Sequence, residues 1–149
     1  MATRGQIGVK GSDVLIYKHW DCYPEETLPT LKDTVGVFYE ERGNDPEYCV
    51  AQIVRAYARR DEERRKERKE RAEKGEQRVM GNYESPSMTG WGLRCKHVAP
   101  DIEYFYWVDL EEPAIEVYEC QEWGYETVEN VRERAPLKER LKLETTQVV

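Results

Sequence analysis

The sequence predicts an α+β domain, in which an antiparallel sheet of about five strands carries a helical hairpin on one face and a projecting charged helix. Three observations predict it: strand-like alternation near both ends of the chain, two consecutive segments with helical periodicity between them, and a run of charged helix formers after the second. At 149 residues the chain fits one domain. We expect that domain over residues 1–136, with a charged helical arm at 55–78 and a loop at 79–92, followed by a weakly ordered tail at 137–149.

The N-terminal segment predicts a β-hairpin. Its strands are residues 6–10 and 14–20, and the tripeptide 11–13 between them, Gly-Ser-Asp, has turn chemistry. The second strand is rich in β-branched and aromatic residues, as strands commonly are. Because side chains alternate along a strand, Lys18 and His19 are expected on opposite faces of the sheet.

Two helices are predicted after the hairpin. Thr27 is the expected N-cap of the first helix and Gly43 is its natural end. Pro46, which follows Asp45, opens the second helix, because proline fits the first helical position. The apolar stripes of the two helices are Leu28, Leu31, Val35, Phe38 and Tyr39, and then Cys49, Val50, Ile53, Ala56 and Tyr57.

Residues 55–78 differ from the rest of the chain in charge. This arm holds 11 basic and 7 acidic residues, a net of +4, whereas the rest holds 12 basic and 23 acidic residues, a net of −11. Acid-first pairs four residues apart, such as Asp61 with Arg65, each favour a solvated helix by about 0.2–0.5 kcal/mol. An acidic body repels phosphate backbones, so nucleic acid is expected only along Arg55 to Arg78. Self-pairing of the arm's charges is the favoured alternative.

Strand patterns return in the second half of the chain. We predict strands over residues 93–98, 102–110 and 114–121, and a short helix over 127–135. In the strongest of these strands one face is expected to carry Ile102, Tyr104, Tyr106, Val108 and Leu110, and the other Glu103, Phe105, Trp107 and Asp109.

Composition predicts a soluble cytoplasmic protein with no membrane contact. No apolar run approaches the roughly 20 residues that cross a bilayer, and the first residues lack a signal-peptide pattern. The four cysteines are widely spaced and form no Cys-x-x-Cys pair, which disfavours a zinc ribbon. We therefore interpret them as small core residues in a reducing compartment.

Several short motifs carry a family resemblance. They are Thr3-Arg4, His19-Trp20-Asp21-Cys22-Tyr23-Pro24-Glu25, Leu28-Pro29-Thr30-Leu31, Asp101-Ile102-Glu103-Tyr104-Phe105-Tyr106 and Val108-Asp109-Leu110. The set resembles a group of small uncharacterised proteins from phages, prophages and other prokaryotic genomes, with the motifs His-x-Asp-Gly-Tyr-Pro-Glu and His-Gly-Asp-Ile-Glu-Tyr-x-Tyr. The resemblance covers both ends of the core but not the arm. It implies a source and an architecture, and no reaction.

The chain departs from the family motifs at two places. Cys22 stands where the family has glycine, so a backbone conformation with positive φ is expected to be altered or strained there. The segment His97-Val98-Ala99-Pro100-Asp101 replaces a compact His-Gly-Asp and moves the histidine away from the acid. A shared catalytic role for His97 is weakened by that insertion.

The two histidine-bearing segments are the first candidate site. His19 and Asp21 are the candidate catalytic residues, and imidazole with carboxylates would suit a divalent metal that activates water for phosphodiester hydrolysis. The alternative is that His19 and Asp21 only fix the local turn by hydrogen bonds. The candidate metal ligands are His19, Asp21, His97, Asp101 and Glu103.

The second candidate site is an aromatic surface. Aromatic side chains on both sides of one strand suggest that one side is an interface, and aromatic faces can stack on a base or nucleotide. The bland alternative is that one set packs under the helices and the other lines a sheet face. The candidate binding residues are Trp20, Tyr23, Tyr104, Phe105, Tyr106 and Trp107.

Together these features favour a binding protein over an enzyme, because the sequence has no nucleophile motif, P-loop or dinucleotide glycine pattern. We expect a small phage-like accessory protein that binds a host protein or a nucleotide-type ligand in the host cytoplasm, with an anti-defence role by analogy and no cofactor. The alternatives are a metal-dependent phosphoesterase or nuclease at the histidine segments and nucleic-acid binding by the arm. A second copy of the chain stays open as a partner.

Overall fold

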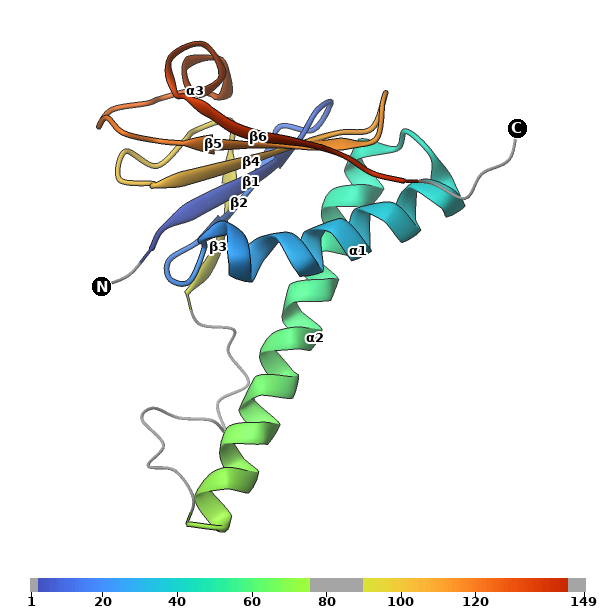
Figure 1. The fold of residues 1–149 in the computed structure, drawn as a ribbon, viewed down its shortest axis with the longest axis vertical. Helices are drawn as coiled ribbons and strands as arrows, with labels where there is room; N and C mark the ends of the chain where they lie inside the picture. The colour runs from blue at the N-terminus through green and yellow to red at the C-terminus, as the bar shows by residue number, and fades with distance from the viewer. Residues whose placement is uncertain (1–2, 76–89, 145–149) are drawn as a thin grey trace.

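The computed structural model describes residues 3–75 and 90–144 (Figure 1). Much of the predicted loop at 79–92, the end of the arm at 76–78 and the last five residues of the predicted tail lie outside the described residues. The elements are β1 (Gly5–Val9), β2 (Val14–Lys18), α1 (Pro24–Arg42), α2 (Pro46–Glu73), β3 (Trp91–Cys95), β4 (Tyr104–Asp109), β5 (Ala114–Glu119), α3 (Val128–Arg134) and β6 (Leu137–Lys142).

The six strands form one mixed sheet in the order β3-β2-β1-β4-β5-β6. An α+β fold is confirmed, but the prediction of about five antiparallel strands is wrong in two respects. First, β1 and β4 at the centre pair in parallel. Parallel neighbours need a long connection, which α1 and α2 supply here. Alternation in a sequence predicts which face a side chain takes and does not predict which strand lies next to it.

The sixth strand is the second difference. Residues 137–142 were expected in a weakly ordered tail, yet they form β6 and pair antiparallel with β5. Four of its six residues are charged, and five are exposed, so no apolar pattern marks it as a strand. Backbone pairing holds it, and just beyond it the Leu143 amide donates to the Pro113 carbonyl at 2.7 Å.

Helices cover both faces of the sheet, rather than one face as predicted. Helices α1 and α2 lie across one face and α3 lies on the other (Figure 1). The faces expected for β2 and β4 are confirmed: Ile16, Tyr106 and Val108 pack in the core beneath α1 and α2. Leu15, Phe105 and Trp107 pack in a second core, on the α3 face.

Helix α1 begins earlier than predicted, at Pro24 with Tyr23 as its N-cap. Thr27 is therefore not a cap: it is buried, its hydroxyl donates to the Cys22 Sγ atom at 3.8 Å, and its carbonyl accepts from the Tyr57 hydroxyl at 2.9 Å. That last bond ties α1 to α2 where α2 leaves the sheet.

Helix α2 is one continuous helix of 28 residues. Its first half packs on the sheet, and its second half projects from the body as the predicted arm (Figure 1). Neither α2 nor any other helix in the described ranges is long and apolar enough to cross a membrane.

Candidate functional site

The face of α2 that packs on the body continues into the arm as a line of arginines. In the body this face carries Cys49, Ile53 and Tyr57, all buried. Residues three or four apart share one face of a helix. At that spacing the face continues with Arg60, Arg64, Arg68 and Arg71, which we call the arginine stripe.

The turn at residues 19–23 lies at the root of the stripe, between β2 and α1. The Cys22 amide donates to the Thr3 carbonyl at 3.0 Å, and the Cys22 carbonyl accepts from the Tyr106 hydroxyl at 2.6 Å. The Cys22 side chain is buried beside Gly5, where a β-carbon would lie 2.5 Å from its Sγ atom. The buried Cys22 side chain and these two backbone hydrogen bonds tie the turn to Thr3 and to Tyr106 of β4.

The strain expected at Cys22 lies one residue earlier. Asp21 has a φ of 57°, in the left-handed region that favours glycine, and Cys22 has no positive φ. The Asp21 carbonyl accepts a hydrogen bond from the Lys18 ammonium at 3.1 Å, which helps to hold this conformation. The prediction of strain at Cys22 itself is therefore wrong.

Lys18 joins the turn, the sheet and the arm. Its side chain is only 5% exposed, and its ammonium lies 5.2 Å from the centre of the Trp91 ring and 5.8 Å from that of Tyr57. The two aromatic rings also contact each other, with their centroids 4.8 Å apart. Burial lowers the pKa of the Lys18 ammonium, because a charged group loses hydration there.

A hollow of about 330 Å³ lies between the turn and the arm. It is lined by Asp21, Glu26, Arg64, Glu67, Arg68 and Arg71. Glu26, in the first turn of α1, pairs with both Arg64 and Arg60, the latter at 3.6 Å. One carboxylate thus serves two arginines. Arg68 has no ion pair within residues 3–75 and 90–144.

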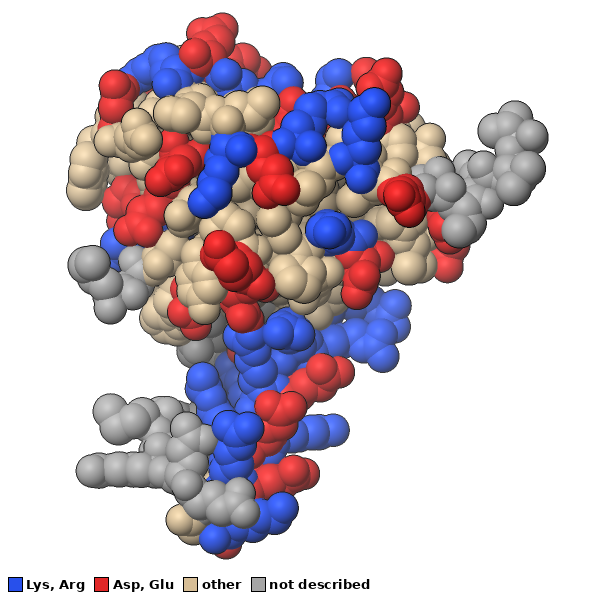
Figure 2. Space-filling model, viewed as in Figure 1, with Lys and Arg blue, Asp and Glu red and all other residues tan. Residues whose placement is uncertain are grey.

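Two aromatic residues of this turn are open to solvent. Trp20 is 45% exposed and Tyr23 is 37% exposed, and they lie one and two residues from Asp21 in the hollow. Trp20 also packs edge-on against the His19 ring, with centroids 5.2 Å apart. The turn thus carries two exposed aromatic groups, and the hollow beside it is lined by three arginines and three carboxylates. Figure 2 shows basic side chains with acidic ones interspersed along the arm.

The remaining predicted binding residues behave differently. Phe105 and Tyr106 are fully buried, Trp107 is nearly so, and Tyr104 is half-buried. An exposed aromatic surface on this strand is therefore wrong for Phe105, Tyr106 and Trp107. Segment 96–103, together with α3, covers the face that β4 was expected to expose, which single-strand alternation could not reveal.

The predicted metal ligands do not gather. In the described part of the chain, no group of three or more His, Cys, Asp or Glu residues is placed to hold a metal ion. His19 Nδ1 instead hydrogen-bonds to the Tyr17 hydroxyl at 2.9 Å, and Asp101 pairs with Arg4 at 3.1 Å. Asp21 lines the hollow beside the arm, whereas the side chains of His97 and Glu103 are exposed.

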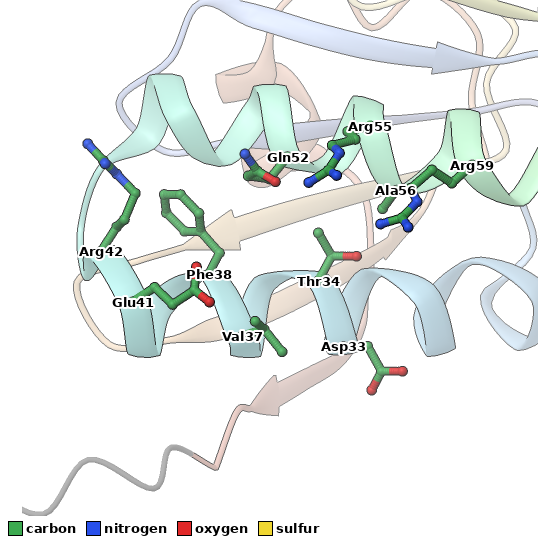
Figure 3. A pocket seen from close by; sticks show the side chains of 10 residues that line it. All are labelled: Asp33, Thr34, Val37, Phe38, Glu41, Arg42, Gln52, Arg55, Ala56 and Arg59. Atoms are coloured by element: carbon green, nitrogen blue, oxygen red, sulfur yellow. The ribbon is translucent and has the colours of Figure 1, made fainter.

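A second hollow, of about 410 Å³, lies between α1 and α2 (Figure 3). Thr34 and Phe38 of α1 point toward α2 and, with Ala56, form its floor. Charged residues of both helices also line it. They are Asp33, Glu41 and Arg42 of α1 and Arg55 and Arg59 of α2.

Sequence reasoning missed the arginine stripe, Glu26 and the buried Lys18. The stripe has a readable signal, since its spacing of four, four and three residues continues the apolar stripe. Lys18 has none, because a lysine in a strand normally faces solvent. Comparison with family models, curated proteins and solved structures finds no match to this chain.

Proposed function

We propose that the protein binds single-stranded nucleic acid, with phosphates along the arginine stripe and a base stacked on Trp20 or Tyr23. The observation that carries this proposal is that the two exposed aromatics belong to the turn whose Asp21 lines one hollow together with Arg64, Arg68 and Arg71 of the stripe. Proteins that bind single strands without sequence preference combine these two elements, arginines for the backbone and aromatic faces for the bases.

The charge of the arm supports the same choice of ligand. The arm has a net charge of +4 and the rest of the chain a net charge of −11, and Figure 2 shows basic side chains, with acidic ones among them, on the part of α2 that projects from the body. A phosphate backbone can then approach the arm without crossing the acidic body. The resemblance to phage proteins implies that the bound single-stranded nucleic acid lies in a host cell. An anti-defence role would follow from binding it there.

Binding of a fluorescently labelled oligothymidylate tests the proposal, followed by anisotropy at 50 mM salt. We expect binding that weakens as salt rises, and a loss of about 5- to 150-fold in Trp20→Ala, since stacking is worth about 1–3 kcal/mol per base. Trp123, which is 77% exposed and lies beyond β5, provides the matched control. Equal affinities for Trp20→Ala and Trp123→Ala, with both variants folded, would remove stacking on Trp20, and the same result for Tyr23→Ala would remove the stacking part of the proposal.

The hollow between α1 and α2 favours a second candidate, binding of a peptide from a partner protein. A floor that includes Phe38 and Ala56, with carboxylates and arginines around it, suits an apolar side chain flanked by charged ones. Ala56→Arg would fill this floor with a large cation. A partner captured by the protein and by Trp20→Ala, but lost with Ala56→Arg, would support this second function.

A further inference from the structure

The two edges of the sheet differ in their protection. The β6 edge carries Lys138, Glu139, Arg140 and Lys142, and charges of this kind discourage pairing with another strand. The β3 edge, Trp91–Cys95, has Arg94 as its single charged residue. Within residues 3–75 and 90–144, β3 pairs with β2 alone, and none of these residues pairs with its other side.

The register shows which backbone groups of β3 point outward. The His19 amide donates to the Gly90 carbonyl, and the Lys96 amide donates to the Asp13 carbonyl. Bonds in an antiparallel pair fall on alternate residues, so the even-numbered residues from 90 to 96 bond to β2. The amides and carbonyls of Trp91, Leu93 and Cys95 therefore face away from the sheet.

These outward groups are symmetric about Leu93. A second β3 strand, antiparallel and related by a two-fold axis beside Leu93, would bring Leu93 opposite its own copy and Trp91 opposite Cys95 of that copy. Every outward amide would then meet a carbonyl, with the Cys95 carbonyl accepting from the Trp91 amide of the copy in addition to its own His97 amide. This is the self-complementarity that a two-fold interface requires. Strand 91–95 ends where this pairing ends, because Lys96 has a φ of 65° and the His97 amide turns back to the Cys95 carbonyl.

The side chain at the centre of the edge also lacks cover. Leu93 is 63% exposed and pairs with Ile16 in the register, so it lies on the face of the sheet that carries α1 and α2. Directly opposite residues in such a pair have side chains in contact. Two Leu93 side chains would thus cover each other.

We propose that the protein forms a symmetric homodimer by antiparallel pairing of β3 with β3 of a second copy. The result is a continuous sheet of twelve strands. Because the two-fold axis stands perpendicular to the sheet, both copies place α1 and α2 on the same face. Both arms then emerge on one side of the dimer.

Sedimentation equilibrium of the full chain tests the dimer. We expect a mass of twice 17.6 kDa at tens of micromolar protein, and a shift toward monomer of at least tenfold in dissociation constant for Leu93→Lys. Leu137→Lys is the matched control, because Leu137 is half exposed on the charged edge and should leave the mass unchanged. A monomer for the unaltered chain at 100 µM overturns the proposal, as does equal weakening by both variants.

A cysteine pair tests the register itself. Opposite residues of a hydrogen-bonded antiparallel pair have Cα atoms about 5.5 Å apart, within the range that a disulfide spans. Leu93→Cys combined with Cys95→Ser should give a covalent dimer on mild oxidation, and Leu137→Cys combined with Cys95→Ser should not. Equal cross-linking of both proteins would contradict β3 as the interface, whatever the nucleic-acid measurements give.

Discussion

One face of α2 runs through both halves of the helix, but its residues differ between them. From Cys49 to Tyr57 the face is apolar and buried against the sheet, and from Arg60 to Arg71 it carries four arginines outside the body. Backbone geometry is the same in both halves. The comparison shows that one helical face can serve two purposes. Its apolar residues hold α2 on the sheet, and its arginines are the part that we propose binds a ligand.

The junction between the halves is where the two roles meet. Tyr57 is the last buried residue on this face of α2. Its ring contacts Trp91, and the Lys18 ammonium lies over it. Three residues later Arg60 already pairs with Glu26 of α1. Substitutions on either side of this junction should therefore separate stability from ligand binding.

The largest expected effect is the loss of stability from Ile53→Ala. Ile53 is fully buried, so removing its side chain leaves a cavity and should lower the free energy of unfolding by about 2–5 kcal/mol. Arg68→Ala, on the same face of the same helix, should change it by less than about 0.5 kcal/mol. Urea unfolding measures both. Comparable losses for the two variants would show that the arm is part of the folding unit.

High pH should destabilise the body next. Burial raises the pKa of the Cys22 thiol to about 11 and that of Cys49 to about 12. Unfolded thiols ionise near pH 8.5, so above that pH the unfolded chain binds fewer protons and stability falls as pH rises. Each thiol should cost about 1.4 kcal/mol per pH unit until its native pKa. Urea unfolding between pH 7 and 10 measures this slope, and Cys49→Ala should reduce it; an unchanged slope would contradict the assignment.

Lys18→Met tests a pH dependence of stability that is opposite in sign to that of the thiols. Because burial lowers the native pKa of Lys18, the unfolded chain binds more protons, and the stability that Lys18 contributes rises with pH up to about 10.4. The free energy of unfolding of the unaltered protein should therefore increase relative to that of Lys18→Met as pH rises from 7 to 10. The difference between their unfolding free energies removes the shared thiol contribution. A difference that shrinks with pH would show that the native ammonium is stabilised rather than desolvated.

Glu26→Gln is expected to change stability only slightly. Glu26 pairs with arginines that are more than a third exposed, so the loss should stay below about 1 kcal/mol. Its effect on binding should be positive, because two arginines lose their neutralising partner. We expect about two- to fivefold tighter binding of the oligothymidylate at low salt. Weaker binding by the variant would mean that Glu26 positions the stripe instead.

Local patterns predicted most elements of this fold and little of its site. Alternation correctly assigned the faces within β2 and β4, because one face of each strand is apolar against α1 and α2. It was wrong for Ile102, which precedes β4 and packs in the second core instead of on the Tyr106 face. It could not predict β6, whose exposed charged residues have no preferred face. Alternation also could not show that Phe105 and Trp107 are buried, because segment 96–103 and α3 cover their face of the sheet.

The site depended on long-range geometry in the same way. His19 and Asp21 lie two residues apart, yet His19 bonds to Tyr17 while Asp21 lines the hollow beside the arm. The left-handed φ of Asp21 is what separates them, because it breaks the alternation of the strand. Trp20 and Tyr23, two of the predicted binding residues, are exposed, and the self-pairing predicted for the arm is present between Asp61 and Arg65.

The salt dependence of oligothymidylate affinity tests the arginine stripe most directly. Arg68→Gln with Arg71→Gln removes two charges on the stripe, and Lys66→Gln with Lys69→Gln removes two on the opposite face of the same helix. Each phosphate contact adds about 0.7 to the slope of log affinity against log salt for a single strand. We expect the slope to fall by about 1.4 in the stripe variant and to stay unchanged in the other. Equal falls in both variants would contradict a binding role for one face of the arm.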